Sequence, residues 1–82
     1  MKKVTIYSTV TCGYCNMAKK FFKENNVEYT EYDVAVNDEK REEMIEKTGQ
    51  MGVPVILIGD EGAEPETIIG FDKERISNLL GL

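Results

Sequence analysis

The sequence has no histidine and two cysteines among its 82 residues, and this shortage limits the metal sites that it can build. The two cysteines form a Cys-x-x-Cys pair, which needs two further cysteine or histidine ligands to complete a zinc site. The chain offers none. We therefore expect no metal bound by its own side chains.

Long apolar runs and an excess of positive charge are missing as well. No run approaches the ~20 apolar residues of a membrane span. Acids outnumber bases by 15 to 10, which gives a formal net charge of -5, whereas nucleic-acid binding relies on clustered Lys and Arg. We expect neither a membrane nor a nucleic acid as partner.

The length of the chain suits one small domain with a single modest core, so residues 1–82 are expected to form one domain. The first residues, 1–4, pass directly into a strand-like segment without an apolar signal region or a small-residue cleavage site. We therefore expect a cytoplasmic protein.

The stretch Cys12-Gly13-Tyr14-Cys15 lies between a strand-like and a helix-like segment. A thiol at a helix N-terminus is favoured as thiolate by the unpaired N–H groups, which lowers its pKa. Cys15, one turn later on the same face, can close a disulfide with Cys12 and reopen it. A structural bridge across so short a loop would add little stability. The pair therefore predicts dithiol redox chemistry, with the more exposed Cys12 attacking first.

Periodicity predicts strands and helices in the order βαβ, helix, β-hairpin, helix. Strands are expected at 3–8, 27–34, 53–58 and 66–69, with the hairpin turn at 59–62. Helices are expected at 13–25, between Asn37 and Gly49, and between Asp72 and Gly81, where these residues serve as caps. These elements pack as an α/β fold, a four-stranded mixed sheet with a parallel βαβ unit and helices on both faces.

This order, the helix-capping cysteines and an apolar strand that opens with Val-Pro resemble the thioredoxin fold, and the short chain resembles a glutaredoxin. The closest stretches are 12–15, 40–45 and Val53-Pro54, while Gly70-Phe71-Asp72 is similar to small glutaredoxin-like redoxins. The resemblance implies that Cys12 is the nucleophile and that Cys15 resolves the mixed disulfide. It also implies a cis bond before Pro54, with the Val53 backbone turned toward Cys12. The substrate or glutathione contacts that it implies are Thr11, Gly13, Tyr14, Val53, Pro54, Gly70, Phe71 and Asp72.

The sequence departs from glutaredoxins at three places. Residues 8–11 contain no Lys or Arg, Gly52 replaces a threonine, and Phe71 stands where a second glycine leaves room for glutathione. We therefore expect a monomeric redoxin that reduces disulfides in protein substrates and has no bound cofactor beyond the redox-active Cys12-Cys15 disulfide. Its expected electron donor is a thioredoxin-reductase-type flavoenzyme, with glutathione as a slower reductant.

Two alternatives belong to other functional classes. Gly13 stands where glutaredoxins usually carry proline, and in some of them a non-proline residue accompanies a bridging [2Fe-2S] cluster, held by the first cysteine and glutathione from two subunits. The second hypothesis is thus a glutathione-dependent cluster carrier that acts as a dimer. The third is an inert adaptor, which would keep full function without Cys12.

Overall fold

The computed structural model describes residues 2–59 and 64–82, which form four strands and three helices. The expected order of elements and the α/β class are confirmed. None of the helices within these residues is long and apolar enough to cross a membrane. The elements are β1 (Lys3–Ser8), α1 (Gly13–Glu24), β2 (Thr30–Asp33), α2 (Asp38–Thr48), β3 (Val55–Gly59), β4 (Glu66–Ile69) and α3 (Lys73–Leu80).

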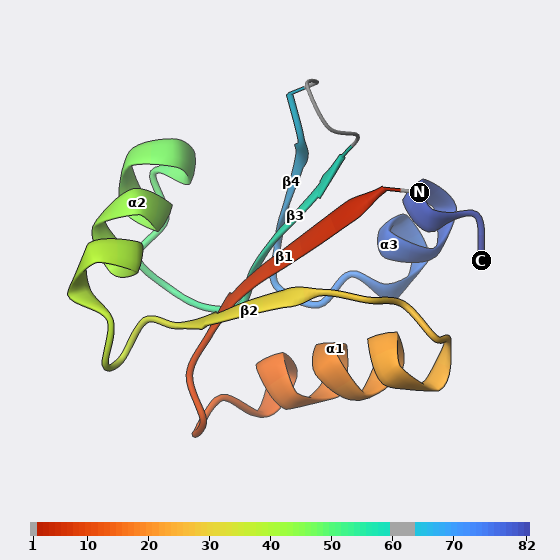
Figure 1. Cartoon of the computed structure of the whole chain (residues 1–82), viewed down its shortest axis with the longest axis horizontal. Helices are drawn as coiled ribbons and strands as arrows, with labels where there is room; N and C mark the ends of the chain where they lie inside the picture. Colours follow the sequence, from red (N-terminus) through yellow and green to blue (C-terminus); the bar gives the residue numbers. More distant parts are fainter. Residues whose placement is uncertain (1, 60–63) are drawn as a thin grey trace.

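The sheet has the strand order β2-β1-β3-β4 (Figure 1). β1 runs parallel to β2 and antiparallel to β3, and β3 and β4 form the expected antiparallel hairpin. Ser8 lies opposite Asp33, Tyr7 opposite Val55, and Val55 opposite Ile69. The ends of β1, β2 and β4 and the start of β3 therefore share one end of the sheet. We call it the cysteine end, because the cysteines follow β1 directly.

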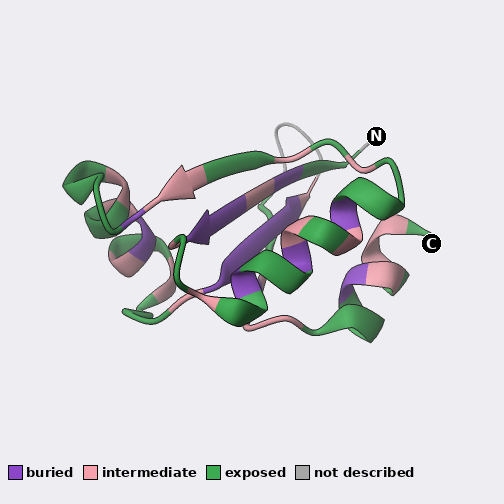
Figure 2. Cartoon of the chain, turned by 90° about the horizontal axis from the view of Figure 1, so that it is seen from below, coloured by how far each residue is buried: buried purple, intermediate pink, exposed green. Residues whose placement is uncertain are grey.

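Helices cover both faces of the sheet, as expected. Figure 1 shows α1 and α3 on one side and α2 on the other, and in Figure 2 the buried residues line the central strands and the inner sides of the helices. β3 is buried on both faces, since its alternate residues join two different clusters. The first cluster, under α1 and α3, contains Val4, Ile6, Ala18, Phe22, Ile56, Ile58, Ile68 and Ile76. The second, under α2, contains Tyr7, Val34, Met44, Val55 and Leu57.

The predicted helix caps of α2 and α3 are confirmed. Asn37 Oδ1 accepts a hydrogen bond from the Lys40 N–H at 3.1 Å, and Asp72 Oδ1 accepts one from the Arg75 N–H at 3.2 Å. Gly49 and Gly81 end these helices with φ values of 71° and 72°, a conformation that glycine adopts without a steric penalty.

Two strands start later than predicted, and the ends of both differ from the prediction by one residue, at Asp33 and Gly59. β2 begins at Thr30 and not at residue 27, because the Val27 N–H donates to the Phe22 carbonyl at 2.8 Å and so closes the end of α1. β3 begins at Val55 and not at residue 53, because Pro54 has no N–H for the ladder. Of the predicted hairpin turn, Gly59 ends β3 and residues 60–62 lie outside the described residues.

Candidate active site

The two cysteines lie at the start of α1, where the loop after β1 delivers them. Cys12 and Cys15 form a disulfide, with their Cα atoms 5.2 Å apart. Cys15 is completely buried, whereas Cys12 is partly exposed. The structure therefore confirms that Cys12 is the more accessible sulfur.

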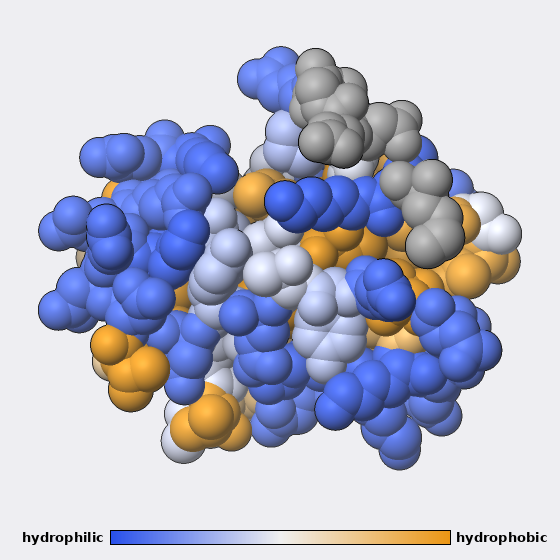
Figure 3. Space-filling model, viewed as in Figure 1, coloured by the Kyte–Doolittle hydropathy of each residue, from blue (hydrophilic) through white to orange (hydrophobic). Residues whose placement is uncertain are grey.

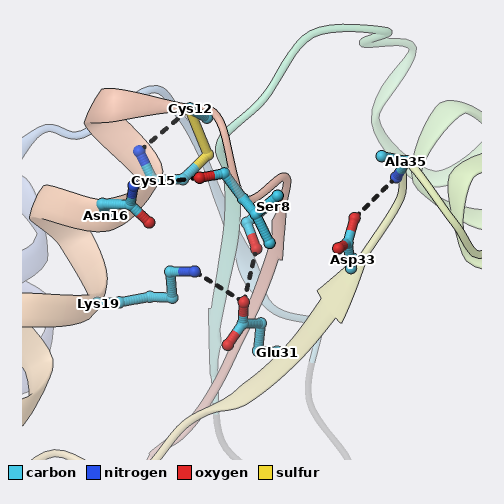
Figure 4. Close-up of polar contacts among 9 residues, drawn as sticks. Ser8, Cys12, Cys15, Asn16, Lys19, Glu31, Asp33 and Ala35 are labelled. Atoms are coloured by element: carbon cyan, nitrogen blue, oxygen red, sulfur yellow. Dashed lines mark hydrogen bonds and ion pairs between the residues drawn. A yellow bond between two sulfur atoms is a disulfide. The ribbon is translucent and has the colours of Figure 1, made fainter.

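Cys12 is also the N-cap of α1. Its φ and ψ of -83° and 114° are extended, and its Sγ accepts a hydrogen bond from the Cys15 N–H at 3.1 Å (Figure 4). The first N–H groups of a helix have no partner within the helix and carry its partial positive charge. In the reduced protein the same contact would stabilise a thiolate at Cys12.

The exposed tip of α1 holds the other predicted residues of the motif. Thr11, Gly13 and Tyr14 are exposed, and Tyr14 keeps 66% of its surface accessible. A Cβ atom added at Gly13 would meet no atom within 4 Å, so the space beside the disulfide is open there. These residues are available to a bound molecule.

A second segment of the site comes from the start of β3 and the end of β4. The Val53-Pro54 bond is cis, as the resemblance implies, and Pro54 is buried. The Gly70 N–H donates to the Pro54 carbonyl at 2.9 Å, and Gly70 has a φ of 82°. This bond holds the Pro54 loop and Gly70 together at the cysteine end.

Phe71 and Asp72 are engaged in the fold. The Phe71 ring packs against Phe21, with centroids 5.8 Å apart, as part of the cluster under α1 and α3. Phe21 lies nine residues beyond Cys12, about 13 Å along the helix. The ring therefore packs at the edge of the core, and its expected place in the space for glutathione stays a prediction. The Asp72 carboxylate caps α3.

A polar cluster beside the disulfide was not predicted from the sequence. Glu31 Oε2 on β2 accepts hydrogen bonds from Lys19 Nζ at 2.8 Å and from the buried Ser8 Oγ at 3.2 Å. Figure 4 shows this cluster directly below the two cysteines. The hydrogen bond from Lys19 lowers the pKa of Glu31. The register of β1 and β2 places Glu31 near Ser8, and the packing of α1 beside β2 adds Lys19; no local pattern signals either contact.

Apolar side chains are exposed around the cysteine end. Of the seven large hydrophobic side chains exposed among residues 2–59 and 64–82, five lie on loops or element ends at the cysteine end, and Met17 lies in the second turn of α1. Figure 3 shows two hydrophobic spots at the lower left, over the loops that follow β1 and β2, and a larger hydrophobic area to the right. An exposed apolar patch is typical of a surface that contacts another molecule. This apolar rim consists of Val10, Tyr14, Met17, Val36, Met51 and Ile69.

Comparisons with known proteins agree with this geometry. A family model described as Glutaredoxin matches residues 4–63. The chain is 38% identical over 77 residues to an uncharacterized glutaredoxin-like 8.6 kDa protein in the rubredoxin operon of Clostridium pasteurianum, covering 94% of this chain and 96% of that protein. It is 41% identical over 58 residues to glutaredoxin 3 of Escherichia coli, covering 71% of this chain and 70% of the relative.

Solved structures share the fold over nearly the whole chain. A mutant of the thioredoxin-like protein BC3987 superposes with a TM-score of 0.83 at 31% identity, covering 99% of this chain and 97% of that one. A glutaredoxin from Archaeoglobus fulgidus gives a TM-score of 0.80 at 22% identity, covering 98% of this chain and 87% of that one, a likeness of fold alone.

Proposed function

This chain belongs to the glutaredoxin family, whose members are generally thiol-disulfide oxidoreductases, and we propose that it reduces disulfides in partner proteins through Cys12 and Cys15. The observation that carries the proposal is the pairing of an accessible sulfur at the N-cap of α1 with a buried one that bonds to it. The accessible sulfur meets the partner, and the buried one completes the reaction.

The reaction proceeds in two exchanges. The Cys12 thiolate attacks one sulfur of the partner disulfide, which breaks that bond, forms a mixed disulfide and releases the second partner sulfur as a thiolate that takes up a proton. The deprotonated Cys15 thiol then attacks the Cys12 sulfur and releases the first partner sulfur, which is also protonated. The partner gains two electrons and two protons, and the protein is left with the Cys12-Cys15 disulfide.

The surroundings of the disulfide support a protein as the substrate. The apolar rim suits the apolar centre of a protein interface better than a small charged peptide. The resemblance assigns the Val53 backbone to pairing with an extended segment of the partner, as in other strand-addition complexes. The hydrogen bond from Gly70 to Pro54 keeps this loop in place for such pairing.

The proposed electron donor is a thioredoxin-reductase-type flavoenzyme, with glutathione slower. Glutathione carries two carboxylates, and residues 8–11 offer no Lys or Arg to bind one. Lys19 and Lys47 do not replace this basic residue, since Lys19 pairs with Glu31 and Lys47 with Glu43. A missing charge-assisted hydrogen bond costs about 1.5–3 kcal/mol, which corresponds to at least a tenfold loss of affinity.

The test compares the turnover of one disulfide-bonded protein substrate with two donors at matched reducing power. One donor is thioredoxin reductase with NADPH, and the other is glutathione with its own reductase. We expect faster turnover with thioredoxin reductase and NADPH than with glutathione and its reductase. Faster turnover with glutathione would identify an ordinary glutathione-dependent glutaredoxin and overturn the proposed donor.

In this proposal the protein works as a monomer in the reducing cytoplasm, where the dithiol is regenerated. Purification without oxygen distinguishes it from the cluster carrier. A colourless monomer supports the dithiol reductant, and a brown dimer that contains glutathione supports the [2Fe-2S] alternative.

A further inference from the structure

A groove runs along the outer side of α1, beside β2, and starts one helical turn beyond Cys12. Its volume is about 490 Å³. It adjoins the apolar rim at its cysteine end, because Met17 lies on the same stretch of α1. It is lined by Asn16, Lys19, Lys20, Lys23, Glu24 and Glu31.

The groove is basic, although the whole chain has a net charge of -5. Glu31 is neutralised by Lys19, whose Nζ lies 2.8 Å from its Oε2. Lys20 and Lys23 are exposed and form no ion pair with another described residue. Among the residues that line the groove, Glu24 opposes them at the end of α1, and Glu31 also attracts Lys23. Two lysines are therefore free to bind an acidic partner.

The sequence spacing places Lys20 and Lys23 on the same side of α1 as Cys12. Positions 12, 16, 20 and 23 recur at intervals of four, four and three, so they fall along one side of the helix. At 1.5 Å per residue, Lys20 lies about 12 Å and Lys23 about 16 Å beyond Cys12 along the axis. An extended chain rises about 3.3 Å per residue, so it covers this distance in four or five residues.

We propose that this basic groove docks an extended, acidic segment of the disulfide-bearing partner, with Asp or Glu four or five residues from the cysteine that Cys12 attacks. The inference rests on the proposed function and names its substrate class. Docking leaves the chemistry unchanged and raises the rate of the first exchange, because opposite charges speed encounter and fix the orientation of the partner.

The test uses two peptides that differ only at the fourth and fifth positions on both sides of a central cysteine, with Glu in one and Gln in the other. The cysteine is in mixed disulfide with 2-mercaptoethanol, which is neutral. Pre-reduced protein converts each peptide to its thiol, releases 2-mercaptoethanol and becomes the Cys12-Cys15 disulfide. Acid quenching and chromatography of the peptide give the single-turnover rate.

We expect the Glu peptide to react about threefold to tenfold faster at low salt, since each exposed ion pair changes an equilibrium by up to about fivefold. The advantage should shrink as salt screens the charges. The double variant K20Q/K23Q should lose it, and Gln keeps the helix propensity of Lys. The control K2Q/K3Q removes the same charge at the opposite end of the sheet and should retain it.

Equal rates for the two peptides at low salt would overturn the proposal, as would an advantage that survives in K20Q/K23Q or disappears equally in K2Q/K3Q. Reduction of 2-hydroxyethyl disulfide, a small neutral substrate, separates docking from chemistry and should stay within about twofold in every variant, as expected when no charge pairs with the substrate. If the reduced wild-type protein fails with this substrate too, the proposed function itself is wrong.

Discussion

Helices α1 and α2 begin with the same type of capping contact, but their cap residues have different roles. In each, the N-cap side chain accepts a hydrogen bond at 3.1 Å from the N–H three residues later, through Cys12 Sγ in α1 and Asn37 Oδ1 in α2. The amide of Asn37 only closes its helix. The sulfur of Cys12 occupies the same field of N–H groups and can also react. The N-cap position, which only stabilises α2, thus holds the reactive sulfur in α1.

The two helices also differ in how they are fixed. α1 buries Cys15, Ala18 and Phe22, whereas α2 buries Met44 alone. The ion pair of Lys19 reaches β2, while Glu43 pairs with Lys40 at 2.9 Å and Lys47 at 3.0 Å within α2 itself. Hydrophilic side chains accordingly cover α2 in Figure 3. The helix that carries the disulfide thus buries more side chains than α2, which contacts the sheet through Met44 and through Lys40 Nζ, 4.3 Å from the Tyr32 ring centroid.

Replacing the α1 cap should have the largest effect. Serine is a good N-cap, so Cys12→Ser should remain folded and lose disulfide reduction down to the background rate. Cys15→Ser should keep the first exchange and accumulate a mixed disulfide with the substrate, visible by mass spectrometry. An adduct on Cys12→Ser with none on Cys15→Ser would reverse the assigned roles.

The field at the start of α1 can be measured directly in the reduced Cys15→Ser variant. We expect the pKa of Cys12 to lie well below the free-thiol value of about 8.5, because the helix N–H groups stabilise the thiolate. The rate of alkylation by iodoacetamide as a function of pH reports this titration. A titration midpoint near the free-thiol value would show that the N–H groups of α1 do not stabilise the Cys12 thiolate.

The α2 cap should affect stability alone. Asn37→Ala should lower the free energy of unfolding by about 1 kcal/mol, because the Lys40 N–H loses its acceptor, while Asn37→Ser should cost little. Urea denaturation measures both, and the reduction rate of the folded protein should be unchanged. A loss of activity in Asn37→Ala without unfolding would show that α2 takes part in the reaction.

The smallest effect is expected at the ion pair between α1 and β2. The Lys19 hydrogen bond lowers the pKa of Glu31 in the folded state, so this carboxylate stabilises the protein above its unfolded pKa of about 4.3. That stability is lost as the pH falls through the lowered pKa. Glu31→Gln should therefore cost about 0.5 kcal/mol at pH 7, since the pair is partly exposed.

Urea denaturation at neutral and at strongly acidic pH tests whether the stabilisation by Glu31 is lost as the pH falls. Glu31→Gln should have a lower free energy of unfolding than wild type at neutral pH. The difference should disappear in acid, where the wild-type carboxyl is protonated and as uncharged as Gln. Glu43→Gln is the matched variant on α2, with both of its partners on its own helix. An equal deficit of Glu31→Gln at both pH values would assign the effect to packing and not to charge.

The sequence predicts what depends on neighbours along the chain. The caps at Asn37, Gly49, Asp72 and Gly81, the helix that starts at the cysteines and the order of the elements along the chain all have local signals, and the structure agrees with them. The start of β2 could not be predicted, because it depends on a hydrogen bond from Val27 to Phe22.

The parts of the site that come from separate segments were less predictable. Glu31 meets Ser8 through the register of β1 and β2, and it meets Lys19 through the packing of α1 beside β2. Phe71 turns to Phe21 because the chain after β4 passes beside α1, which no pattern around residue 71 indicates. The apolar rim gathers residues from three loops, the first two turns of α1 and the end of β4, so it has no period that a sequence could display.

The position of β1 between β2 and β3 has a consequence for the order of folding. The segment from β1 to β2 can close through α1, and the hairpin of β3 and β4 is also local, but the two join only when β1 pairs with β3 far along the sequence. Such long-range closure is slow compared with local steps. The cysteines belong to the first unit, and Pro54 and Gly70 belong to the second. A chain arrested before the two units join would carry the cysteines without the Pro54 loop and Gly70 beside them.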